Sequence, residues 1–393
     1  MWIPPSRLIA LALVGALGVL LFTWSGSYNV AATSGHWPAA GWLLRYTMKN
    51  SVELHALPLS APPLDDLALV EQGAGHYETG CAPCHGAPGW APNRIPRNML
   101  PVPPFLPPHV ADWSAEELFW LVRHGLKYTG MPSWPAEGRD DEVWAITAFL
   151  LRLPEMSPEE YAALAIGAAG AAPMRAADAP LPQSAGALFE LEEAALLGAC
   201  ARCHGIDGSG RPSGAFPRLD IQSPDYLHRA LREYALGIRP SGMMGPVAAA
   251  LGETQMARLA RHYSGADTPA ANHAADADGA ADQALLDRGL EIAAIGIAEA
   301  EVPPCAACHG LEAGPANAEF PALGGQHQDY LHRQLLLWKA GTRGGSAYSE
   351  IMRTIVARMS LEDLEAAARY YASLPPPAMA DAAEQGPAPD DAP

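Results

Sequence analysis

Three copies of the pentapeptide Cys-x-x-Cys-His are spread along the chain, and together they use all six cysteines. They comprise Cys81, Cys84 and His85; Cys200, Cys203 and His204; and Cys305, Cys308 and His309. In this pentapeptide each thiol can add across a vinyl group of haem, and the histidine can ligate the iron. The motifs therefore predict three covalently attached c-type haems, with no cysteine left for a disulfide.

A single Cys-x-x-Cys pair is also compatible with a redox dithiol or with half of a zinc site. A zinc site would need a second Cys or His pair at suitable spacing. Here the pairs lie far apart in the sequence, and each is followed at once by its own histidine. The pattern therefore favours haem over both alternatives.

A methionine downstream of each motif could supply the second axial ligand of the iron. The candidates are Met131 in a Gly/Pro-rich loop, Met243 or Met244 after the second motif, and Met352 after the third. A thioether ligand favours ferrous iron, so His/Met coordination suits reversible one-electron transfer. The alternative is that these methionines only fill gaps in the core.

An internal repeat relates the second and third motifs and separates the two methionine candidates. Its matched segments are Phe216-Pro217-x-Leu219 with Phe320-Pro321-x-Leu323, Asp225–Arg229 with Asp329–Arg333, and Gly237-Ile238-Arg239 with Gly341-Thr342-Arg343. Tyr263 follows Met244 at the distance at which Tyr371 follows Met352. The repeat therefore selects Met244 and predicts two adjacent domains made from one duplicated unit.

The duplicated part, roughly residues 186–375, resembles the diheme cytochrome c4 family. The third unit carries the family pattern at Phe320, Pro321, Leu323, Gln326, Tyr330, Gln334, Leu335, Gly341, Arg343, Met352 and Tyr370-Tyr371. The second unit departs at Ala230, where the glutamine is missing, and at Asp220-Ile221, where the third unit has Gly324-Gly325. The resemblance implies an all-α fold in which an N-terminal helix crosses a C-terminal helix beside the haem.

The preceding unit, residues 65–160, resembles a class I cytochrome c domain but lies outside the repeat. Its run Gly125–Trp134 is similar to a methionine-ligand loop of monohaem domains. Amphipathic periodicity predicts helices at 67–77, 114–123, 140–153, 254–263 and 361–374. No convincing alternation of strand residues occurs, so we expect three all-α class I cytochrome c domains behind an N-terminal transmembrane helix.

The resemblance also implies roles for residues around the haems. The carbonyls of Pro217 and Pro321 would accept a hydrogen bond from the ligating histidines, and Pro104 is a weaker match in the first unit. Arg239 and Arg343 would pair with haem propionates. A solvated surface position is the alternative for both arginines.

The N-terminal segment predicts export. Residues 8–24 are uncharged and follow Arg7, which suits either a short membrane anchor or the core of a signal peptide cleaved after Val30-Ala31-Ala32. We expect an uncleaved anchor in the cytoplasmic membrane. Covalent haem attachment takes place outside that membrane, which predicts haem domains in the periplasm.

Composition divides the chain into segments. The expected divisions are an anchor or signal sequence (1–30), a juxtamembrane segment (31–64), domain 1 (65–160), an Ala/Pro linker (161–185), domain 2 (186–266), a linker (267–283), domain 3 (284–375) and a disordered acidic tail (376–393).

The net charge is −18, from 43 acidic and 25 basic residues. This balance argues against a nucleic-acid partner and favours docking on a basic protein surface. We expect a membrane-tethered electron carrier without a catalytic residue, serving a terminal oxidase, a bc complex or a dehydrogenase. The alternative is the haem subunit of a periplasmic dehydrogenase; a diheme peroxidase is disfavoured, because three methionine candidates leave no open iron.

Overall fold

The computed structural model describes residues 4–167, 193–264, 280–311, 314–315, 317, 320–345 and 348–376. Within these ranges every regular element is helical, and only two isolated bridges, Ala87 with Trp90 and Ile297 with Val302, have β geometry. The protein is all-α, as predicted. Most of the two expected linkers and of the acidic tail lies outside the described residues.

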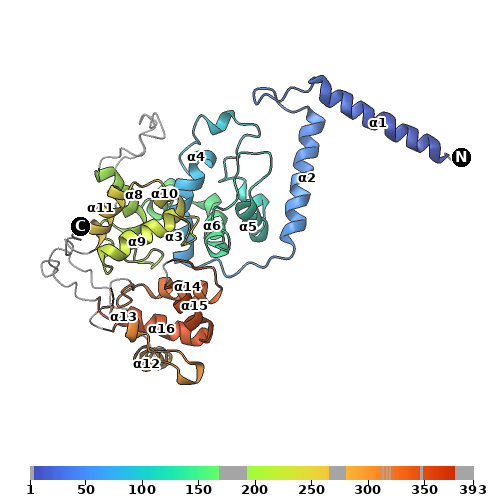
Figure 1. Cartoon of the computed structure of the whole chain (residues 1–393). Helices are drawn as coiled ribbons and strands as arrows, with labels where there is room; N and C mark the ends of the chain where they lie inside the picture. The colour runs from blue at the N-terminus through green and yellow to red at the C-terminus, as the bar shows by residue number, and fades with distance from the viewer. Residues whose placement is uncertain are drawn as a thin grey trace, which may run out of the picture.

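The longer helices are distributed along the whole described chain (Figure 1). They are α1 (Pro5–Ser25), α2 (Pro38–Ala56), α3 (Leu67–His76), α5 (Ala115–His124), α6 (Asp140–Arg152), α7 (Pro158–Ala165), α8 (Glu193–His204), α9 (Pro224–Ala235), α11 (Glu253–Tyr263), α12 (Ala280–Ala294), α14 (Gln328–Lys339), α15 (Ser349–Ala357) and α16 (Leu361–Ser373). Shorter elements are α4 (Ala82–His85), α10 (Met244–Ala249), α13 (Ala306–His309), the π-helical turn η1 (Tyr77–Cys81), and the 3-10 turns η2 (Pro96–Asn98), η3 (Val110–Asp112), η4 (Leu153–Glu155) and η7 (Ala298–Ala300). The five helices expected from periodicity correspond to α3, α5, α6, α11 and α16, and no end differs from the expected one by more than one residue.

The starts of several helices follow from their capping residues. Ser114, Ser157 and Ser360 each accept a hydrogen bond from the backbone N–H three residues later, and the acidic residue there reaches back to the serine N–H. This reciprocal pairing satisfies two N–H groups that the first turn leaves free. The serines therefore fix where α5, α7 and α16 begin.

Two helix crossings organise the first and third units, and each depends on a glycine. A Cβ at Gly73 of α3 would lie 2.1 Å from the carbonyl oxygen of Ala145 in α6. A Cβ at Gly289 of α12 would lie 2.2 Å from the carbonyl oxygen of Ala366 in α16. The backbones of the crossing helices can approach this closely only because these positions carry no side chain.

Buried side chains form a separate cluster around each motif. The first cluster includes Val70, Tyr77, Val143, Ile146 and Phe149 from α3, η1 and α6. The second includes Leu196, Leu227, Leu259, Ala260 and Tyr263. The third unit holds two adjoining clusters, around Ile292, Trp338, Val356 and Leu364 and around Leu331 and Tyr371. A motif cysteine packs against each group of clusters: Cys81, Cys200 and Cys305.

Helix α1 extends away from the remaining helices (Figure 1), and none of its residues is buried. Its length and apolar composition would allow it to cross a membrane. Helix α2 lies within the predicted juxtamembrane segment 31–64, where no helix was expected from periodicity. Its last turns bury Val52 and Ala56, and the His55 ring lies 5.6 Å from the Trp120 ring of α5, so α2 joins α1 to the body of the protein.

We predict that alanine at Gly73 or at Gly289 destabilises the protein, since the new methyl group would meet a backbone carbonyl. Overpacking of this kind costs about 1–3 kcal/mol, or more where backbone must move. Chemical unfolding of the full-length holoprotein, followed by far-UV circular dichroism, would measure the loss.

The control is Gly198→Ala in α8, where a Cβ would have no atom within 4 Å. That variant should be neutral or more stable by about 0.5–1 kcal/mol. Equal behaviour of Gly73→Ala and Gly198→Ala would contradict the close crossing.

Candidate haem sites

The three motifs adopt one local conformation. After each histidine the chain turns through a glycine of positive φ, which is +71° at Gly86, +76° at Gly205 and +69° at Gly310. A side chain would be strained in this left-handed region. The turn directs the following segment back past the histidine ring, where a carbonyl oxygen meets it.

Each motif histidine hydrogen-bonds to a proline carbonyl further along the chain. The distances from Nδ1 to the carbonyl oxygen are 2.9 Å for His85 with Pro104, 3.3 Å for His204 with Pro217, and 2.9 Å for His309 with Pro321. A ring that donates through Nδ1 keeps the lone pair of Nε2 free for a metal. Pro104, the weaker sequence match, makes the same contact as the two prolines of the repeat.

Burial changes the acid–base behaviour of both residue types in the motifs. It lowers the pKa of His85, His204 and His309, against the smaller raising effect of the proline carbonyls. Burial also raises the pKa of Cys81 to about 12, and that of Cys200 and of Cys305 to about 11. Reactive dithiols have a lowered thiol pKa instead, so the environment suits neutral ligating histidines rather than redox catalysis at sulfur.

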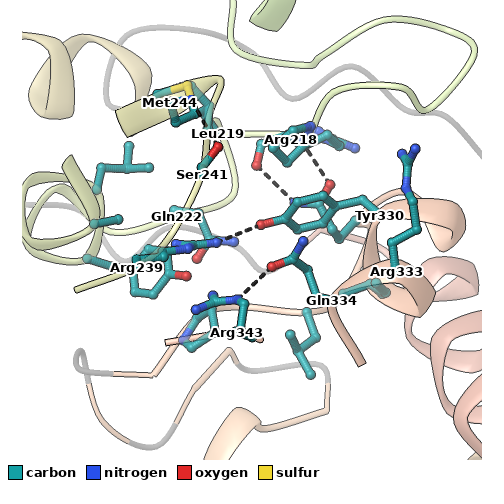
Figure 2. A pocket seen from close by; sticks show the side chains of 18 of the residues that line it. Arg218, Leu219, Gln222, Arg239, Ser241, Met244, Tyr330, Arg333, Gln334 and Arg343 are labelled. Atoms are coloured by element: carbon teal, nitrogen blue, oxygen red, sulfur yellow. Dashed lines mark hydrogen bonds between the residues drawn. The ribbon is translucent and has the colours of Figure 1, made fainter. Parts of the chain in front are cut away.

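Residues of the second and third motifs line one continuous cavity of about 420 Å³. Figure 2 shows part of its wall, with Met244, Arg239 and Arg343. Both sets of motif residues line it, together with Met244, Met352, Arg239 and Arg343. The structure thus brings together these ten residues, all of them predicted to surround two haems. Neither His85 nor Met131 lines this cavity. Met131 lies in a separate loop, where its N–H donates to Thr129 Oγ1 at 3.0 Å.

The two repeated units face each other through a reciprocal pair of glutamines. The Gln222 side chain donates to the Ala322 carbonyl at 2.9 Å and accepts from the Ala322 N–H at 3.0 Å. The Gln326 side chain makes the same two bonds with Arg218, at 2.9 and 2.8 Å. Because Gln222 matches Gln326 and Arg218 matches Ala322 in the repeat, the two halves are related by a local two-fold arrangement.

The repeat shows that Gln222 and Gln326 occupy equivalent positions in the two units. It does not show that the units face each other, so the contact could not be predicted from the sequence. The departure at Asp220 also has a structural counterpart. Asp220 forms a buried ion pair with Arg218 at 2.6 Å, and Arg218 donates to the Gly325 carbonyl across the interface at 3.3 Å. Asp220, which stands where the third unit has Gly324, therefore supports the contact between units through Arg218.

The two predicted arginines come close together in the cavity wall. Arg239 is buried, donates to the Tyr330 hydroxyl at 3.1 Å and lies over the Tyr234 ring. Arg343 donates to Gln334 Oε1 at 2.6 Å, and its guanidinium lies over the Trp338 ring. Figure 2 shows both hydrogen bonds.

Neither arginine forms an ion pair with a carboxylate in the described part of the chain. Burial lowers the pKa of Arg343, and the positive charge of Arg239 lowers it further. Enclosed cations normally need an anionic partner, so this wall fits an anionic group such as the carboxylates of haem.

Helix α3 of the first unit and the turn η1 after it close one side of the same cavity, α3 through Gln72, Gly75 and His76 and η1 through Thr79. Glu71 of α3 pairs with Arg211 at 2.7 Å, and Gln72 accepts from Arg333 at 3.2 Å. The first unit is thereby fixed against both repeated units.

The chain is similar in sequence to known proteins. Residues 68–150 match the family model described as cytochrome c oxidase, cbb3-type, subunit III. A thiosulfate dehydrogenase electron acceptor from Stutzerimonas stutzeri is 35% identical over 176 residues, covering 45% of this chain and 79% of the relative. Cytochrome c4 from Pseudomonas aeruginosa is 31% identical over 176 residues, covering 44% and 83%. The crystal structure of reduced cytochrome c4 from Pseudomonas stutzeri covers 47% of this chain and 98% of its own, at 28% identity and a TM-score of 0.41.

The helical fold, the haem-attachment motifs and these relatives define an electron-transfer protein of the c-type cytochrome class, with covalently bound haem c. Within that class, the chain belongs to the cytochrome c4 family through a diheme class I module.

We predict that Gln222→Ala and Gln326→Ala each destabilise the protein by about 1–3 kcal/mol, because each leaves a buried N–H and a buried carbonyl without a partner. Thermal unfolding of the holoprotein would show the loss. Gln283 is the matched control, since it is exposed and its side chain bonds to exposed Asp287 one helical turn away, and its alanine variant should change stability by less than about 0.5 kcal/mol. Similar small effects at all three positions would contradict the reciprocal contact.

Proposed function

We propose that this chain is a membrane-tethered triheme c-type cytochrome of the periplasm, which passes single electrons between respiratory partners and towards a terminal oxidase. The observation that carries the proposal is the histidine geometry. All three motif histidines donate to a proline carbonyl, and two of the three motifs open into one cavity.

The proposed ligand set follows from the motifs, the repeat and the lining of the cavity. The axial pairs are His85 with Met131, His204 with Met244, and His309 with Met352. The six motif cysteines attach the haems, and Arg239 and Arg343 hold their carboxylates. When bound, each haem supplies a reversible one-electron couple, and methionine ligation raises its potential. Met243 packs against the first core cluster, which supports Met244 as the ligand.

The residues of the chain set the conditions for transfer. Pro104, Pro217 and Pro321 fix the orientation of the histidine rings and increase their basicity. The aromatic and aliphatic lining of the shared cavity keeps water away from the second and third sites, which limits solvent reorganisation during transfer. The shared cavity places two sites within one enclosure, so that an electron need not cross solvent between them.

The proposed domain organisation keeps three haem domains at 65–160, 186–266 and 284–375, behind an anchor at α1. Exposed aromatic side chains near α1 support attachment to a membrane surface, since Trp24, Trp37, Trp42 and Tyr46 are all more than half exposed. Tryptophan and tyrosine favour the interface between lipid and water. The acidic chain suits brief docking on basic redox partners.

Two of the similarities to known proteins support different redox partners. The family model matched by residues 68–150 describes an oxidase subunit, which supports delivery to a terminal oxidase. The relative from Stutzerimonas stutzeri is an electron acceptor of thiosulfate dehydrogenase, which supports the second candidate function, a haem subunit that accepts electrons from a periplasmic dehydrogenase. A bc complex is a further candidate donor.

Replacing Met244 by alanine should remove one of three methionine-to-iron bands at the red edge of the ferric spectrum and lower one of three midpoint potentials. Met243→Ala is the matched control and should keep all three bands. An optical redox titration of the purified protein measures both quantities. Loss of a band in Met243→Ala instead would assign the ligand to Met243, and fewer than three bands in the unmodified protein would contradict the triheme ligand set.

Membrane purification of the tagged, full-length protein should separate the two partner hypotheses. We expect haem-copper oxidase activity to copurify after mild solubilisation, and we expect the reduced cytochrome to be oxidised by that fraction. Copurification of a dehydrogenase that reduces the cytochrome, without oxidase, would favour the second candidate function.

A further inference from the structure

The methionine loop of the second unit is held by a residue from the first. Glu142 lies in the first turn of α6 and is 2% exposed. Its Oε1 accepts from Ser241 Oγ at 2.6 Å, and its Oε2 accepts from the Gly242 N–H at 2.6 Å. Both donors immediately precede Met243 and Met244. A single buried carboxylate thus binds the start of the loop that carries the proposed iron ligand.

Ser241 links Glu142 to Met244 through hydrogen bonds. Its Oγ accepts from the Met244 N–H at 3.0 Å and from the Met243 N–H at 3.2 Å, while its proton is directed to Glu142. The hydroxyl therefore joins the carboxylate to the first backbone N–H of α10. Charge-assisted hydrogen bonds are among the stronger ones in proteins, so displacement of the carboxylate would release the N-terminal end of α10.

Glu142 is itself fixed from its own unit. Arg139 Nη2 pairs with Glu142 Oε1 at 2.9 Å, and Trp134 Nε1 donates to Glu142 Oε2 at 3.2 Å. Arg139 also donates to the Pro240 carbonyl. The Trp134 ring covers Gly242 so closely that a Cβ there would lie 2.3 Å from Trp134 Cε2. Trp134 follows Met131 by three residues, so the two methionine loops meet at this carboxylate.

The described residues give Met352 of the third unit a different setting. Met352 is the fourth residue of α15, which has nine residues, whereas Met244 is the first residue of α10, which has six. The position equivalent to Gly242 carries Glu350, an exposed residue that pairs with Arg353 of the same helix at 2.5 Å. Met244, at the very start of a short helix, has less support from its own helix than Met352 has.

We propose that Glu142 is a positioning residue, which holds the Met244 loop in place for the second haem from the neighbouring first unit. This inference rests on the proposed function, because it takes Met244 as the ligand. It adds that methionine coordination in the second haem site depends on docking of the first unit. The haem sites of the first and second units are thereby coupled through the buried side chain of Glu142.

The test compares Glu142→Ala and Ser241→Ala with Asp363→Asn in the full-length holoprotein. Asp363 is the matched control: it too lies in the first turn of a C-terminal helix and pairs with an arginine, Arg288, at 2.8 Å. We expect both Glu142→Ala and Ser241→Ala to weaken the methionine-to-iron band of one haem and to lower its midpoint potential. Asp363→Asn should lose stability but keep three bands and three unshifted potentials. Met244→Ala identifies which haem is affected.

The direction in which the midpoint potential of the affected haem shifts distinguishes a positioning role of Glu142 from a purely electrostatic one. Glu142→Ala removes a buried negative charge, while Arg139 keeps its ion pair with Asp141 at 2.8 Å. Loss of a nearby negative charge disfavours ferric iron, so a purely electrostatic role would raise the potential. A loosened methionine lowers it. An unchanged band with a raised or unshifted potential in either variant would overturn the proposal. If Glu142→Ala does not fold, Ser241→Ala, which removes only the linking hydroxyl, decides the question.

Failure of this inference can be told apart from failure of the proposed function. The unmodified protein must show three methionine-to-iron bands for the ligand set to stand. Three bands there, together with three bands in both variants, would retain the triheme cytochrome and reject only the role of Glu142.

Discussion

Buried backbone groups must find hydrogen-bond partners, and at the centre of this protein they find them across the boundary between two helical units. Gln222 and Gln326 each satisfy one N–H and one carbonyl of the opposite half. Breaking the boundary would expose all four bonds together. The facing of the two units, and with it the single cavity that their motifs share, depends on this exchange.

Two cations stand in the wall of the cavity that results. The side chains that Arg239 and Arg343 contact directly supply hydroxyl, amide and aromatic groups. Glu233 lines the same cavity but pairs with Arg229. Elsewhere the buried arginines do have acidic partners, as Arg218 has Asp220 and Arg139 has Glu142. This contrast indicates that a bound anion would supply the ion-pair partner of Arg239 and Arg343.

Much of this arrangement could be predicted from the sequence, because the relevant signals are local. The motifs, the histidine–proline relation and the five helices are encoded in short stretches whose spacing has a direct physical meaning. The helix α2 was missed, since its exposed aromatic and basic residues hide the usual apolar periodicity.

The contacts between units were also missed. Glu142 reads in the sequence as an ordinary acidic residue in the first turn of a helix, a position that the helix dipole alone would explain. Its partners Ser241 and Gly242 lie about a hundred positions away. Such contacts leave no local pattern, and the repeat marks Gln222 and Gln326 as equivalent without showing that they meet.

The hydrogen bond between Gln72 and Arg333 joins positions 261 residues apart. Closing so long a loop carries a large entropic cost, and contacts of this sequence separation form slowly. The wall that α3 contributes to the shared cavity is therefore completed only after the last unit has been made. Gly75 of α3 lies against the second motif, since a Cβ there would be 3.2 Å from Cys203 Sγ. This order of folding therefore leaves Cys203 without that cover until the three units close on one another.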